Sequence, residues 1–230
     1  MCITVTSSCD TAKQLLNNLP QNGGGLSTDD IVAGLKQALT VGTQNGTSKL
    51  SAVDGFFANA AIKVLMPPEA QKVENTLRSI GLGSVVDKAV LSMNRAAEDA
   101  AKSATPIFVD AIKQMTITDA LGILKGGKTA ATDYFKQKTT LALTSAFKPV
   151  VSQSLDKVNA TKYWKDVFST YNKFSSNPVN TDLSGYVTGK AIDGIFYQVA
   201  SEEQKIRQDP AARVTDLLKK VFGSSQAQGN

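Results

Sequence analysis

The stretch from Asp182 to Arg213 constrains the fold most, because its apolar residues recur with the period of one long α-helix. At 3.6 residues per turn, Glu202 falls inside the apolar stripe. A carboxylate on a buried face needs a partner, so we expect Glu202 to meet Arg95 or another arginine. The apolar residues that share this stripe are Ala191, Ile192, Ile195, Val199 and Ile206.

Helical signals continue through most of the preceding chain. Ser27 with Asp30, and Thr116 with Asp119, have the spacing of a capping-box variant at a helix start. No apolar and polar residues alternate with period two between turns, which excludes a predicted strand. We therefore predict an all-α fold, a single multi-helix domain of about nine or ten helices with a long C-terminal helix. The predicted helix ends are at Gly42–Gly46, Pro67–Pro68, Gly81–Gly83 and Gly126–Gly127.

Two helices in this prediction have notable boundaries. One is expected from Ser51 to Val64, where the two prolines stop it. Another is expected from Thr129 to Lys157, and Pro149 should kink or break it, because proline removes a backbone hydrogen bond.

A short sequence echo links two distant segments. Residues 52–57 (AVDGFF) recur as residues 191–196 (AIDGIF). Glycine inside a helix costs about 1 kcal/mol relative to alanine. We therefore predict that Gly55 and Gly194 lie at close helix crossings.

The N-terminal segment resembles the cleavage region of a bacterial lipoprotein. Small residues precede Cys9, and a polar stretch leads to three glycines. Either the start of the chain is truncated or Cys9 is an ordinary thiol, because the stretch before it is too short for a signal peptide. We predict that Cys9 carries a lipid anchor. The domain prediction is a tether over residues 1–26, a helical domain over 27–223 and a disordered tail over 224–230.

The composition excludes several functions. The chain contains no histidine, which removes Ser-His and Cys-His nucleophiles and the commonest zinc and iron ligand. We therefore expect no metal and no cofactor. The net charge of +5 is spread without a basic block, so we expect no nucleic-acid partner. No apolar run is long enough to span a bilayer.

A set of polar residues has two alternative interpretations. Because lysine supplies most of the positive charge, each arginine is a candidate for forked pairing that lysine cannot replace. The first interpretation is an ion-pair network that joins the fourth helix to the C-terminal helix. The alternative is a hydrolase or lyase that uses Glu202 and Glu203 as acid and base, with Arg95 binding an anionic group. The network candidates are Asn94, Arg95, Glu98, Glu202, Glu203, Arg207 and Arg213.

The segment from Gly122 to Thr129 matches the phosphate-loop pattern G-x-x-x-x-G-K-[ST]. A phosphate loop follows a strand, whereas Thr118 to Leu124 has a helical pattern. We interpret the segment as a turn between two helices.

Several separated strings resemble the bacterial domain of unknown function 4197. They are residues 94–98 (NRAAE), 130–135 (AATDYF), 191–196 (AIDGIF), Glu202–Glu203, Ile206–Arg207, Pro210 and 217–223 (LLKKVFG). The resemblance implies a helical bacterial protein, often exported, with no assigned activity to carry over.

We expect a lipid-anchored bacterial envelope protein, facing the periplasm or in the outer membrane. Its helical module would bind a protein partner or small ligand without catalysis, and Cys9 would join it to the membrane. Besides the enzyme, a further alternative is a carrier of an apolar ligand between helices. The phenylalanines considered for such a pocket are Phe56, Phe57, Phe108, Phe135, Phe147 and Phe196.

Overall fold

The computed structural model describes residues 27–173, 178, 180, 182–209, 213 and 216–223. These residues form helices, turns and loops and contain no strand, which confirms the all-α class. Both predicted capping boxes are present, at Ser27 with Asp30 and at Thr116 with Asp119. In chain order the elements are α2 (Thr28–Ser51), the 3₁₀ helix η1 (Pro68–Ala70), α3 (Gln71–Ser79), α4 (Gly83–Ala101), α5 (Ala104–Lys113), α6 (Ile117–Lys125), α7 (Ala130–Asp156), α8 (Ala160–Asn172), α9 (Leu183–Gln208) and α10 (Asp216–Gly223).

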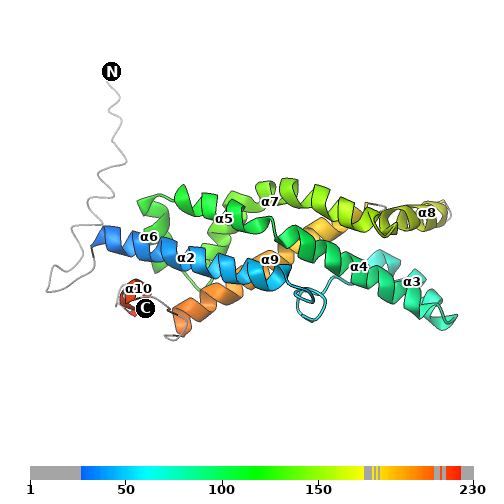
Figure 1. Ribbon diagram of the computed structural model, residues 1–230, viewed down its shortest axis with the longest axis horizontal. Coiled ribbons are helices and arrows are strands. Elements are labelled where there is room, and N and C mark those ends of the chain that lie inside the picture. Colours follow the sequence, from blue (N-terminus) through cyan, green and yellow to red (C-terminus); the bar gives the residue numbers. More distant parts are fainter. Residues whose placement is uncertain are drawn as a thin grey trace, which may run out of the picture.

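The long helix α9 packs against α7, α2 and α4 and forms the centre of the core. In Figure 1, α2 and α6 lie toward one end of the elongated molecule, and α3 and α8 lie at the other. Every apolar residue of the predicted α9 stripe is buried. The sequence therefore predicted the buried face of the central helix correctly.

Helix α2 is longer than predicted, because the glycines read as its end lie inside it. A Cβ on Gly42 would sit 3.4 Å from the Cδ1 of Ile206, and one on Gly46 would sit 3.3 Å from the Cγ of Gln198. Both neighbours belong to α9. The two glycines, four residues apart on one face, let α9 approach α2 closely.

The helix predicted from Ser51 to Val64 is absent. Residues 52–62 form mostly turns, and residues 63–67 have no regular secondary structure. Asp54 has a φ of 67°, which a continuing right-handed helix does not allow. Gly55 is therefore not a helix-crossing residue. A Cβ there would lie 2.5 Å from the carbonyl oxygens of Lys49 and Leu50, so the turn after α2 requires glycine.

Helix α7 continues through Pro149 without a break. Pro149 is on the exposed side of the helix. The carbonyl that loses its hydrogen bond can therefore be satisfied by water, which makes a proline tolerable at this position.

Candidate functional site

The predicted polar residues form two separate clusters rather than one network between α4 and α9. Arg95 and Glu98 belong to the first cluster, and Glu203 and Arg207 belong to the second. Among the described residues, no hydrogen bond or ion pair joins the two clusters.

The first cluster fastens the segment 52–67 to α4. The Asn94 side chain accepts from the Val64 amide at 2.9 Å and donates to the Val64 carbonyl at 2.8 Å. One Glu98 oxygen accepts from the amides of Phe56 and Phe57 at 3.1 and 3.2 Å. Because Asn94 and Glu98 are buried, they satisfy backbone groups that would otherwise lack partners.

Arg95 completes this cluster from the solvent side. Its guanidinium donates to Glu98 at 2.6 Å and to Asp54 at 2.7 Å. These two bonds raise the pKa of Arg95 above its ordinary value. The fork therefore connects α4 to the turn after α2, as expected of an arginine that lysine cannot replace.

The second cluster closes the turn between α6 and α7. Glu203 accepts from the Ala131 amide at 3.0 Å and from the Thr132 amide at 2.9 Å, at the N-terminus of α7. Arg207 pairs with Glu203 and donates at 2.7 Å to the Ile123 carbonyl in the last turn of α6. A carboxylate therefore meets the positive end of one helix and a guanidinium meets the negative end of another.

This arrangement explains the phosphate-loop match. Helix α6 ends at Lys125 and α7 begins at Ala130, so the segment is an inter-helix turn, as predicted. In a phosphate loop, the amides at the helix start would surround phosphate. Here the Glu203 carboxylate occupies the amides of Ala131 and Thr132, and the Thr129 hydroxyl donates to Asp133 at 3.1 Å.

The sequence prediction selected the wrong glutamate for arginine pairing. Glu202 accepts from Gln198 at 2.9 Å and from Lys205 at 2.7 Å, and neither partner is an arginine. Glu203 is the carboxylate paired with Arg207, at 2.9 Å. The adjacent glutamates thus have different partners and are not arranged as an acid and base around Arg95.

Arg213 also serves the fold. Its guanidinium donates to the carbonyls of Ile206 and Arg207 at 3.0 and 2.8 Å. These carbonyls lie in the last turn of α9, where the helix leaves acceptors without internal partners. Arg213 therefore caps the C-terminus of the central helix.

The echoed segments meet in space, although only one is helical. A Cβ on Gly194 would clash with the ring of Phe56. Gly194 thus permits close packing, as predicted, but against a ring of the segment 52–67 and not against another helix.

The phenylalanines considered for a ligand pocket belong to the packed core. Phe56, Phe108, Phe135 and Phe147 are fully buried. The ring of Phe108 makes edge-to-face contacts with those of Phe135 and Phe196, at 5.2 and 6.2 Å between centroids. These rings fill space between helices and do not surround a ligand cavity.

A cavity of about 310 Å³ lies elsewhere, between α3, α4 and α8, and we call it the apolar groove. The rings of Trp164 and Phe168 contact each other on one wall, with 4.4 Å between centroids and a tilt of 43°. The Trp164 indole donates to the Asn180 carbonyl at 3.1 Å. Of the described residues that line it, Lys88 is the only one with an ionisable side chain. The lining residues are Met66, Val73, Leu77, Val85, Val86, Lys88, Ala89, Ser92, Met93, Val158, Ala160, Trp164, Phe168 and Leu183.

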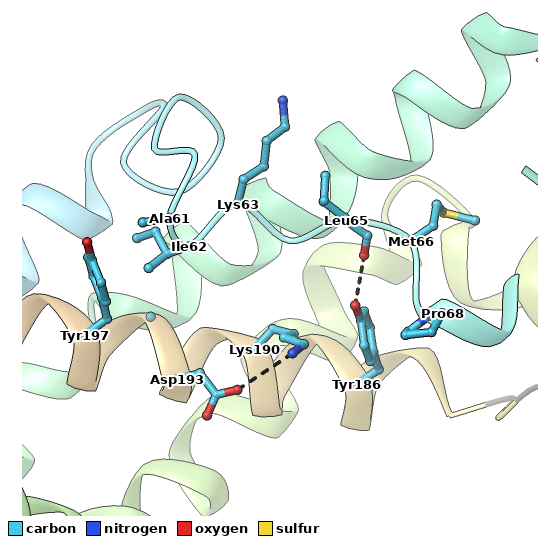
Figure 2. Close-up of a pocket in the computed structure, with 11 residues that line it drawn as sticks. Ala61, Ile62, Lys63, Leu65, Met66, Pro68, Tyr186, Lys190, Asp193 and Tyr197 are labelled. Atoms are coloured by element: carbon cyan, nitrogen blue, oxygen red, sulfur yellow. Dashed lines mark hydrogen bonds and ion pairs between the residues drawn. The ribbon is translucent and has the colours of Figure 1, made fainter. Parts of the chain in front are cut away.

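A second hollow of about 460 Å³, the α9 groove, lies between residues 61–68 and α9. Figure 2 shows Tyr186 directed at the Leu65 carbonyl, to which its hydroxyl donates at 3.0 Å. Lys190 and Asp193 pair with each other at 3.9 Å. This groove is more polar than the apolar groove, because Lys63 lines it together with the Lys190–Asp193 pair.

The part of the chain that the structure describes shows neither a metal-binding cluster nor a membrane-spanning helix. No group of three or more acidic or cysteine side chains is placed to hold a metal ion. None of the described helices has the length and apolar character needed to cross a membrane. Cys9 lies outside the described residues, so its lipid attachment stays a prediction.

Comparison with known proteins gives a family but no described activity. No curated protein and no solved structure matches the chain. Residues 25–223 match the family model of DUF4197, a family of proteins of unknown function. Because this match spans most of the chain, the chain belongs to the DUF4197 family.

Proposed function

We propose that the protein is a lipid-anchored component of the bacterial envelope whose helical domain binds a small apolar ligand. Cys9 would hold it at the membrane, and the apolar groove would hold the ligand. The observation that carries the proposal is the lining of this groove, whose described side chains are apolar except for Lys88 and Ser92.

The dimensions of the groove suit a small molecule. Ligand sites in proteins typically occupy about 300 to 1,000 Å³, with mainly apolar walls and few polar groups. The volume of about 310 Å³ lies at the lower end of that range. Val85 and Val158 remain more than half exposed at its edge, so a ligand would remove apolar surface from water.

The use of the polar residues favours binding over catalysis. Glu98 and Glu203 each accept hydrogen bonds from backbone amides and pair with an arginine. These groups stabilise helix ends and a long connecting segment. We therefore propose no acid/base role for Glu202, Glu203 or Arg95.

Trp164 provides a direct test, because it is the only tryptophan of the chain and lines the groove. Titration with the apolar dye N-phenyl-1-naphthylamine should quench Trp164 and sensitise dye emission with saturation at one dye per chain. Ala89→Phe should fill the groove and abolish the signal. Ser92→Phe, on the same helix face, provides a second filling variant.

The matched control is Ala33→Phe, which adds the same ring at an exposed position of α2. It should bind dye like the unaltered protein. Circular dichroism should show that all variants retain their helical content. Equal dye binding by folded groove-filled variants and the control would contradict the proposed site.

The anchor requires a separate test in the native bacterium. Mass spectrometry of the protein purified from its own membranes should find acyl groups on Cys9. Cys2→Ser should leave this modification unchanged, whereas Cys9→Ser should remove it and release the protein from the membrane fraction. An unmodified Cys9 would refute the anchor and leave the groove proposal intact.

A further inference from the structure

We propose that the ligand of the apolar groove is a single-chain carboxylic acid, with its aliphatic tail in the groove and its carboxylate at Lys88. This inference rests on the proposed function, because it specifies the ligand of the same site. Two observations carry it: the nature of the walls and the position of the charge.

The walls suit a flexible aliphatic chain. A methylene group needs roughly the 30 Å³ that a water molecule occupies in the liquid, so the groove can hold about ten methylene groups. Met66, just before η1, and Met93, on α4, both line the groove, and methionine adapts its shape to irregular ligands. Leu183 and Phe168 are almost fully buried and supply a closed apolar floor.

Lys88 supplies the recognition of the acid. It lies three residues after Val85, on the same face of α4, and Val85, Lys88 and Ala89 all line the groove. Among the described residues no ion pair includes Lys88, whereas the neighbouring Asp87 pairs with Arg78 at 2.9 Å. An ammonium at an apolar groove without an acidic partner is complementary to an anionic head group.

The other polar lining group does not compete for this role. The Ser92 hydroxyl donates to the Lys88 carbonyl at 2.8 Å. Its proton is therefore engaged within α4. The Lys88 ammonium remains as the donor that can meet a carboxylate, and its exposed position avoids the cost of burying a charge.

The experiment compares decanoate with decanol, which share a tail length and differ in head-group charge. Both are titrated at pH 7.5 against protein loaded with N-phenyl-1-naphthylamine, and displacement is followed by Trp164 fluorescence. Lys88→Met keeps the aliphatic stem and removes the charge. Lys125→Met, at an exposed position of α6, is the matched control.

Lys88→Met should weaken decanoate binding about two- to fivefold, the range for exposed ion pairs, and leave decanol binding unchanged. Lys125→Met should change neither, and 0.5 M salt should reduce the decanoate preference of the unaltered protein. Dye binding without displacement by decanoate would overturn the inference but not the proposed function. Equal effects of Lys88→Met on both ligands would also overturn it, and absence of dye binding would overturn both proposals.

Discussion

Removal of the Glu203 side chain tests whether the second polar cluster stabilises the fold. Glu203→Ala would leave the amides of Ala131 and Thr132 and the guanidinium of Arg207 without their carboxylate partner. The Glu203 side chain is only 5% exposed, and that of Arg207 is 13% exposed. Breaking a buried ion pair by deleting one partner costs about 3 to 5 kcal/mol.

We expect a loss of about 3 kcal/mol in the free energy of unfolding, at the low end of that range. Arg207 keeps its hydrogen bond to the Ile123 carbonyl, which offsets part of the loss. Glu203→Gln keeps an acceptor of the same shape but loses the charge, so it should cost about 1.5 to 3 kcal/mol. Urea unfolding followed by far-ultraviolet circular dichroism measures both values.

Glu202→Ala is the matched control because it removes the same side chain at the next position. Its ion-pair partner Lys205 is 50% exposed, so this change should cost less than about 1 kcal/mol. Equal losses for Glu202→Ala and Glu203→Ala would refute the assignment of the stabilising contacts of the second polar cluster to Glu203.

Two further predictions concern packing and acid stability. Gly194→Ala should destabilise the fold by about 1 to 3 kcal/mol, because the added methyl group would clash with Phe56. Gly189→Ala should stabilise the fold by about 0.4 to 1 kcal/mol, because a Cβ there would have no neighbour within 4 Å. The same urea assay measures both changes. Two destabilising changes of similar size would contradict this reading. The hydrogen bond from Lys102, supported by one from Ser154, lowers the pKa of Asp99 in the folded protein. The ionised Asp99 carboxylate should therefore stabilise the fold above its unfolded pKa of about 3.9, and this stabilisation should be lost as pH falls through its lower pKa in the folded protein. Asp99→Asn should therefore reduce the loss of stability between about pH 4 and pH 2, and an unchanged acid unfolding profile would count against this contribution.

The sequence predicted features whose determinants are local. Ser27 and Thr116 begin helices because their hydroxyls accept from amides three residues later, as the capping-box spacing indicates. The apolar stripe of α9 follows directly from the helical period. No distant residue is needed to predict either feature.

Several features that depend on distant partners were not predicted. Gly42 and Gly46 were read as a helix end, because glycine favours both helix ends and close packing, and only the approach of α9 distinguishes the two roles. Glu202 and Glu203 are adjacent in sequence, and the position of α7 decides which one is buried. The apolar groove combines several helices, although Trp164 and Phe168 at helical spacing gave one local signal for it.

The strings that resemble the family have a common structural property, which explains why they identify a fold without identifying a reaction. Asn94 and Glu98 hold the segment after α2, residues 131–132 donate to Glu203, and Gly194 packs against Phe56. Each of these contacts joins parts of the chain that are far apart in sequence. The segment held by Asn94 carries Met66 into the wall of the apolar groove. The first polar cluster therefore positions a wall of the groove. In the proposed function it would serve binding indirectly, and the ligand itself would contact the apolar residues that those strings do not contain.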